Sequence, residues 1–159
     1  MYINELRAGG GFMDIQEIQS SIIRSMSEEK IKDIVTIYLF GSRANKKYNP
    51  NSDYDIAVLL KDSVPKDIYF EKKLDYIDFF TSILETDQVD LLILNKAPLE
   101  IAYRVFAQGC ILYENENYKK ERVRFQAKTF SMYFDFLPAK KVLSNGLKKR
   151  IKEGRYGGG

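Results

Sequence analysis

Apolar positions along the chain change their spacing several times, and each change marks a different predicted element. After Asp14, isoleucines recur three or four residues apart, which is the pattern of an amphipathic helix with an N-cap. Short runs rich in β-branched and aromatic residues, such as IVTIYLF at 34–40, instead indicate buried strands. The two patterns alternate, so we expect an α/β (α+β) fold. The expected helices are 14–30, 66–84 and 98–108, and the expected strands are 34–40, 53–60, 89–94 and 110–114.

The spacing after residue 114 is helical and strongly basic. Apolar residues from Val123 to Leu137 fall on one helical face, and a proline at 138 is expected to end that helix because it lacks an N–H. Leu143 to Ile151 then predict a second C-terminal helix. The expected organisation is a flexible N-terminal extension at 1–13, a core at 14–114, and a basic helical segment with a mobile tail at 115–159. The core is predicted to be a short mixed sheet with helices on one face and the chemistry on the other.

The composition excludes several classes of site. The 159 residues contain no His, which rules out Ser–His and Cys–His nucleophiles, His-pair ribonuclease sites and His-ligated zinc. The one cysteine, Cys110, is read as a buried small hydrophobe, in keeping with a reducing compartment. No apolar run approaches the roughly 20 residues of a membrane helix, and the start has no apolar signal region. We therefore expect a cytoplasmic protein without membrane contact.

Charge is divided unevenly along the chain. The net charge is +3, but residues 119–155 hold twelve Lys or Arg and three acids, so the rest of the chain is acidic. A basic run can be a solvated helix face, a nucleic-acid contact or a protein interface. The many Phe, Tyr and Met residues beside it favour a protein interface, and no direct nucleic-acid binding is expected. Packing of those aromatic rings onto the core is the alternative.

Acidic residues stand at the start of two predicted strands. Asp53 and Asp55 are two residues apart in an extended chain, so their carboxylates share one face about 6.5–7 Å apart. Two like charges at that distance are unfavourable unless a divalent cation lies between them. Asp90 on a third strand offers another carboxylate, with Asp87 as a competitor in the preceding loop. Oxygen ligands suit Mg²⁺ or Mn²⁺, so these residues are candidate metal ligands for phosphoryl transfer.

A Gly-Ser pair stands where the first predicted strand ends. Gly41 permits a tight turn and a close backbone approach, and the N–H groups and hydroxyl at Ser42 can then hold a phosphate. Arg43 is either a phosphate contact or a surface charge. The expected reaction is attack of an acceptor oxygen on the α-phosphorus of a nucleoside triphosphate, with loss of pyrophosphate.

Gly41-Ser42, a ten-residue interval and then Asp53-Tyr54-Asp55 at the head of a strand together resemble the signature of the polymerase-β-type nucleotidyltransferase superfamily. At this length the chain resembles a minimal nucleotidyltransferase (MNT) antitoxin of the HEPN/MNT type VII toxin–antitoxin systems. The core resemblance covers about residues 30–112. Two positions depart from the usual pattern, because Asn45-Lys46 stands where Arg-Gly is frequent and Tyr54 fills the middle of the Asp-x-Asp motif.

The resemblance implies an ATP- and Mg²⁺-dependent transfer of AMP to a tyrosine of a HEPN ribonuclease toxin, which silences the toxin. It also implies a role in nucleotide-phosphate binding for Gly41 and Ser42, and a carboxylate role for Asp53, Asp55 and Asp90. On this reading the segment 119–156 docks on the HEPN partner in a hetero-oligomer.

Two other functions stay open at this stage. An antitoxin can neutralise its toxin by binding and occlusion, with the transferase site weak or unused. The same site can also serve a small acceptor, as in aminoglycoside nucleotidyltransferases. Those enzymes usually carry a larger C-terminal domain, and only about forty residues follow this core.

Overall fold

A four-stranded sheet forms the centre of the molecule, with the strand order β3-β2-β1-β4. The computed structural model describes residues 13–47 and 49–154, so most of the expected N-terminal extension and the end of the expected tail lie outside the described residues. β1 pairs antiparallel with β2 and β4, whereas β2 and β3 are parallel, so the predicted mixed sheet is confirmed. The strands are β1 Ile34–Phe40, β2 Tyr54–Leu60, β3 Val89–Ile93 and β4 Cys110–Glu114.

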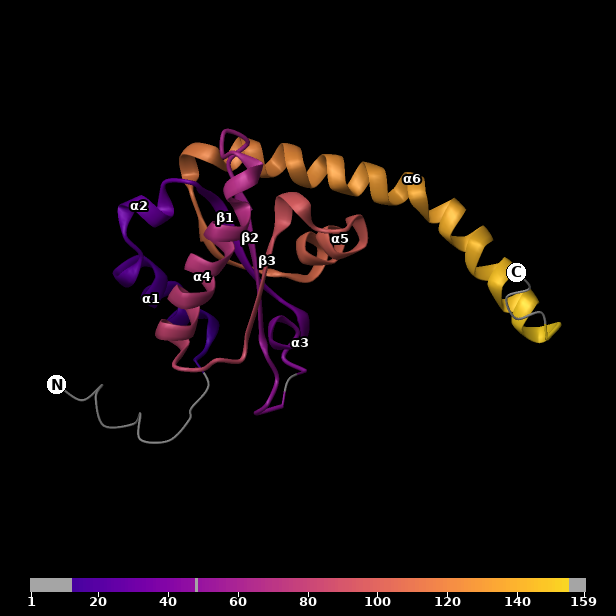
Figure 1. Cartoon of the computed structure of the whole chain (residues 1–159), viewed down its shortest axis with the longest axis horizontal. Helices are drawn as coiled ribbons and strands as arrows, with labels where there is room; N and C mark the ends of the chain where they lie inside the picture. The colour runs from indigo at the N-terminus through magenta and orange to yellow at the C-terminus, as the bar shows by residue number, and fades with distance from the viewer. Residues whose placement is uncertain (1–12, 48, 155–159) are drawn as a thin grey trace.

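Helices cover both faces of this sheet, which corrects the prediction of helices on one face only. α1 (Ile15–Ser25) and α4 (Tyr69–Leu84) pack on one face over a fully buried set of isoleucines, valines and leucines. α5 (Leu99–Gln108) and the beginning of α6 (Lys119–Lys152) pack on the other, smaller apolar face. Figure 1 shows the two layers on opposite sides of the strands. Both faces are covered because both sets of alternating strand residues are apolar along most of β1 and β2.

The first expected helix is shorter than predicted. Asp14 is its N-cap, as expected, and forms a capping box with Glu17. The helix then ends at Met26, whose backbone is extended and whose side chain is buried, and Ser27 caps the short α2 (Glu28–Ile31). Burial of the Met26 side chain and capping by Ser27 thus divide into two helices a stretch that apolar spacing alone predicts to be one helix.

The C-terminal segment is one helix instead of the two predicted. α6 continues through Pro138, and Figure 1 shows that it bends along its length. A proline inside a helix removes one backbone hydrogen bond and kinks the helix without always ending it. Pro138 is exposed, so water can reach the carbonyl that loses its N–H partner.

Short turns complete the chain. α3 (Gly41–Ala44) follows β1 directly, and three 3₁₀ turns lie before α4, α5 and α6. They span Lys66–Ile68, Leu94–Lys96 and Glu116–Tyr118. Among the described helices, none has the length and apolar character needed to cross a membrane.

Candidate functional site

Asp55 and Asp90 are brought together by the sheet. They are direct partners in the parallel pairing of β2 with β3. Their neighbours Ile56 and Leu91 point into the core beneath α1 and α4, so alternation turns both aspartates to the opposite face. Paired strands lie about 4.8 Å apart, so the two residues stand next to each other at one edge of the sheet.

Asp53 completes an acidic group around Asp55. It is exposed and lies just before β2, while Asp55 is half-buried. Burial raises the pKa of the Asp55 carboxyl above its ordinary value, the carboxylates of Asp90 and Asp53 raise it further, and Arg43 opposes them. The structure therefore pairs Asp90 with Asp55 and places Asp53 within electrostatic reach of Asp55, whereas Asp87 lies in the turn before β3 and does not pair with Asp55.

Gly41 lies against this acidic group because Phe40, the last residue of β1, pairs with Asp55. Gly41 has a φ of +70°, and a Cβ built on it would stand 2.1 Å from Asp55 Oδ2. A residue with a side chain fits neither the dihedral angle nor the space. The turn after β1 and the head of β2 thus touch only because residue 41 is glycine.

The turn that contains Ser42 is held by one backbone hydrogen bond and by the Asn45 side chain. The Lys47 N–H donates to the Ser42 carbonyl at 3.1 Å, and the Asn45 amide donates to the Gly41 carbonyl at 3.2 Å. These bonds fix the backbone of α3 beside the acidic group. Asn45 stands where the resembled family often has arginine, and here its amide supports the turn.

Arg43 faces inward. Its side chain is 6% exposed, and Nε donates to the carbonyl oxygens of Ser52 at 2.8 Å and Asp53 at 3.2 Å. The guanidinium also stacks over the Tyr54 ring, 3.8 Å from its centroid. Arg43 therefore binds the backbone at the head of β2. The expected surface charge is wrong, because the side chain is buried, and the expected phosphate contact stays a prediction. The stacking on Tyr54 was not predicted from the sequence, for which the unusual tyrosine in the middle of the motif is the available signal.

The acidic group does not form a closed metal site as it stands. Within the described ranges, no three or more His, Cys, Asp or Glu side chains are arranged so that they could hold an ion. The donor chemistry nevertheless fits a hard cation, because the carboxylates of Asp90 and Asp53 both act electrostatically on Asp55, and carboxylate oxygens are the ligands that Mg²⁺ prefers. The Asp55 carboxylate lies where a side chain at residue 41 would stand, so the backbone of the α3 turn adjoins it.

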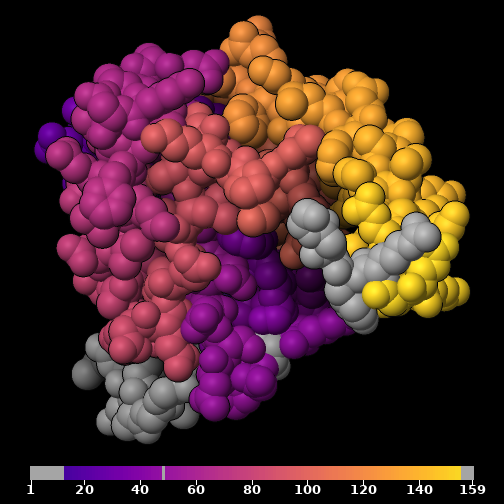
Figure 2. All heavy atoms as spheres, turned by 45° about the vertical axis from the view of Figure 1, so that its right-hand side comes forward, coloured from indigo at the N-terminus to yellow at the C-terminus, as the bar shows by residue number. Residues whose placement is uncertain are grey.

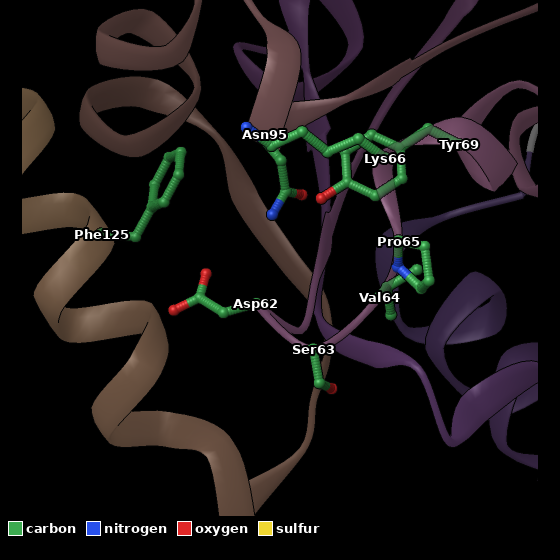
Figure 3. Close-up of a pocket in the computed structure, with 8 residues that line it drawn as sticks. All are labelled: Asp62, Ser63, Val64, Pro65, Lys66, Tyr69, Asn95 and Phe125. Atoms are coloured by element: carbon green, nitrogen blue, oxygen red, sulfur yellow. The ribbon is translucent and has the colours of Figure 1, made fainter.

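A pocket of about 420 Å³ lies at the opposite end of β2, away from the aspartates. Figure 3 shows it between the loop that holds Asp62, the start of α4 at Tyr69, and Phe125 of α6. Asn95 lines it, but the Asn95 amide exchanges two hydrogen bonds with the backbone of Leu60. This pocket is therefore built around a structural contact and is separate from the acidic group.

Comparisons with known proteins agree on one family. The model described as "Polymerase beta, Nucleotidyltransferase" matches residues 21–118. A "Protein adenylyltransferase MntA" of Shewanella oneidensis is 32% identical over 121 residues, which cover 75% of this chain and 80% of the relative. A protein of the same name from Aphanizomenon flos-aquae is 32% identical over 106 residues, covering 63% of this chain and 69% of that one.

Solved structures extend the likeness to most of the fold. A toxin–antitoxin crystal structure with AMP-PNP matches with a TM-score of 0.61 and 25% identity, covering 86% of this chain and 99% of that chain. A structure of a tri-AMPylated Shewanella oneidensis HEPN toxin in complex with its MNT antitoxin matches with a TM-score of 0.61 at 25% identity, covering 85% and 99% of the two chains. This chain belongs to the polymerase β nucleotidyltransferase family, in the group that includes the MntA protein adenylyltransferases.

Proposed function

We propose that this chain is an antitoxin that transfers AMP from ATP to a tyrosine of a HEPN-domain toxin and thereby neutralises the toxin. The observation that supports this most is the meeting of Asp55, Asp90 and Gly41 at one edge of the sheet, in a chain related to protein adenylyltransferases. Related chains occur in complexes with a HEPN toxin that carries AMP. The partner is therefore a protein, and the nucleotide is ATP.

In this proposal the α3 turn receives the triphosphate. Gly41 lets the backbone approach closely, and the N–H groups and hydroxyl of the Ser42 region donate to phosphate oxygens. Asp53, Asp55 and Asp90 would hold Mg²⁺ or Mn²⁺. When bound, such ions neutralise the charge that builds on the phosphates and on the attacking oxygen.

The transfer itself is a displacement at phosphorus. The tyrosine oxygen forms a bond to the α-phosphorus, and the bond between that phosphorus and the bridging oxygen to the β-phosphate breaks, so pyrophosphate leaves. The phenolic proton passes to a carboxylate of the acidic group. The chain orients the two reactants through the fixed turn at Gly41 and through the adjacent heads of β2 and β3.

Arg43 has a positioning role in this scheme. Its contacts with the Ser52 and Asp53 carbonyls and with the Tyr54 ring hold the segment that carries Asp53 and Asp55. A guanidinium suits this task because its planar fork can donate to carbonyls while its face stacks on a ring. The nucleotide phosphates are then left to the α3 backbone.

Coexpression with the toxin separates catalysis from occlusion. We expect cells to survive with the intact chain and to stop growing with the double variant Asp53→Asn/Asp55→Asn, which keeps the fold but loses two carboxylates. Copurification of toxin with the double variant shows that binding persists. Full protection by the double variant would mean that binding alone neutralises the toxin, and the catalytic proposal would then be wrong.

A further inference from the structure

α6 consists of a packed half and an exposed half. In the packed half, Tyr133 stacks on Tyr103 of α5 with 3.7 Å between the ring centroids. Lys140 Nζ then contacts Glu100 Oε1 at 2.7 Å. Every residue from 141 to 152 is exposed, and Figure 1 shows this part of α6 extending away from the sheet. We call residues 141–152 the distal arm.

The face of α6 that packs on α5 continues along the distal arm as a row of apolar residues. Steps of three or four residues lead from Tyr133 through Lys140 to Leu143, Leu147 and Ile151, so these side chains share one helical face. Leu143, Leu147 and Ile151 are 68%, 59% and 49% exposed, and together we call them the distal stripe. The distal stripe is thus an apolar face that no residue described by the structure covers.

A helix with an exposed apolar face is stabilised by a partner that covers that face. Isolated helices of about 12 residues are marginal in water, since most helical stability comes from packing of an apolar face. The distal arm also contains Ser144, Asn145 and Gly146 in succession, which are poor helix formers. Covering the distal stripe would supply the packing energy that this sequence lacks.

Charge selects the kind of partner. Between residues 139 and 152 there are six basic residues and no acidic one. Two copies of this segment would repel each other, so a second copy of the chain is disfavoured as the occupant. Nucleic acid would satisfy the lysines but leave the distal stripe in water. A protein surface with an apolar groove and acidic rim satisfies both.

We propose that the distal arm is the docking site for the HEPN-domain protein of the proposed function, on which this inference rests. The toxin would cover the distal stripe with an apolar groove whose acidic rim faces the flanking lysines. Figure 2 shows a hollow below α5 and beside the purple segment that follows β1, with the yellow end of α6 on the same side of the molecule. In this proposal a protein seated on the distal stripe also reaches the α3 turn and the acidic group, where its tyrosine is modified.

The test compares two faces of the same helix. Leu147→Asp/Ile151→Asp places charge in the distal stripe, whereas Val142→Asp makes the same kind of change at a site that is 71% exposed and off the stripe. Binding of each purified variant to its HEPN-domain partner is measured by titration calorimetry. We expect the Kd of the stripe variant to rise at least about 100-fold and that of Val142→Asp to stay within about threefold. Circular dichroism confirms that both variants keep their fold.

Failure of this proposal is distinguishable from failure of the proposed function. If the stripe variant binds as tightly as the intact chain, the docking proposal is overturned even where AMP transfer occurs. If binding depends on the distal stripe but no variant transfers AMP, docking stands and the transferase role falls. A fluorescent single-stranded RNA serves as the second probe. If the stripe variant loses RNA binding while it keeps toxin binding, the arm is a nucleic-acid site and the proposal is overturned.

Discussion

The Asp55 carboxylate occupies the space beside Gly41 where a side chain at residue 41 would stand. A Cβ there would lie 2.1 Å from Asp55 Oδ2 and 2.9 Å from its Cγ, and the Gly41 φ of +70° independently disfavours any other residue. The turn after β1 and the head of β2 therefore contact each other directly, through Gly41 and the Asp55 carboxylate.

Gly41→Ala should disrupt the site. The new methyl group must displace Asp55, and the left-handed backbone costs about 1–2 kcal/mol for a residue with a side chain. We expect AMP transfer to fall at least about 100-fold, equivalent to about 2.7 kcal/mol in the barrier. The melting temperature should fall as well, and both are measured on the purified protein.

Gly146→Ala is the matched control, because nothing lies within 4 Å of the added methyl group. Gly146 is inside α6, so alanine there should stabilise the helix by about 1 kcal/mol. Equal effects of the two substitutions would contradict the special role of Gly41.

Asp55→Asn should raise the stability of the metal-free protein while it abolishes transfer. Burial and the neighbouring Asp90 and Asp53 raise the pKa of Asp55 in the fold, so the folded state disfavours the ionised carboxyl. The stability that the protonated Asp55 carboxyl contributes is therefore lost as the pH rises through the pKa of this group in the folded protein. At neutral pH the neutral amide removes that penalty.

Thermal unfolding in the presence of a chelator measures this effect. We expect a higher midpoint for Asp55→Asn at pH 7, and the difference should shrink near the ordinary aspartate pKa of about 3.9. Asp135→Asn, at an exposed position on α6, should change the unfolding free energy by less than about 0.5 kcal/mol. A lower midpoint for Asp55→Asn at pH 7 would show that the ionised group stabilises the fold instead.

Arg43→Lys should affect turnover more than nucleotide binding. Lysine keeps the charge but loses the forked donation to the Ser52 and Asp53 carbonyls and the flat face over Tyr54. We expect a loss of about 2–3 kcal/mol in unfolding free energy and a fall mainly in kcat. Steady-state kinetics with varied ATP separate the two constants.

The control for this substitution is Arg104→Lys, since the Arg104 side chain is 57% exposed on α5. It should leave both stability and kcat near their original values. A large rise in KM for ATP with unchanged stability in Arg43→Lys would instead indicate that Arg43 contacts the phosphates directly.

Removal of divalent ions should stop transfer but leave toxin binding intact. The three carboxylates form no closed ion site as they lie, so the ion is expected to be exchangeable. After dialysis against a chelator, we expect transfer to fall at least about 1000-fold and to return with Mg²⁺ or Mn²⁺. Toxin binding serves as the control, because the distal stripe consists of apolar residues and includes none of these carboxylates. Undiminished transfer without divalent ions would exclude a metal-dependent reaction.

The sequence predicted the strands well because their composition leaves little choice. Runs such as Ile34–Phe40 are β-branched or aromatic throughout and are confirmed as strands. The breaks between helices were harder to predict. Met26 ends α1 through burial of its side chain, and Pro138 stays inside α6 because its surroundings are exposed. Neither outcome depends on local apolar spacing, so periodicity alone could not have found it.

Only part of the candidate site could be predicted from the sequence. The proximity of Asp53 and Asp55 was predicted from strand alternation, although β2 begins only at Tyr54, and the placement of Asp90 requires β2 and β3 to be parallel neighbours. Strand order depends on tertiary packing, and for Asp90 the family resemblance gave the stronger indication. Arg43 shows a different limit, since residue type does not reveal whether an arginine points outward or binds nearby carbonyls.

Mass spectrometry of the HEPN-domain partner tests the central claim most directly. The purified toxin is incubated with the intact chain, ATP and Mg²⁺, and its peptides are then compared with those from a reaction containing Asp53→Asn/Asp55→Asn. The proposed function predicts one or more adenylyl groups on tyrosine in the first reaction and none in the second. Unmodified toxin in both reactions, despite binding of the intact chain, would contradict it.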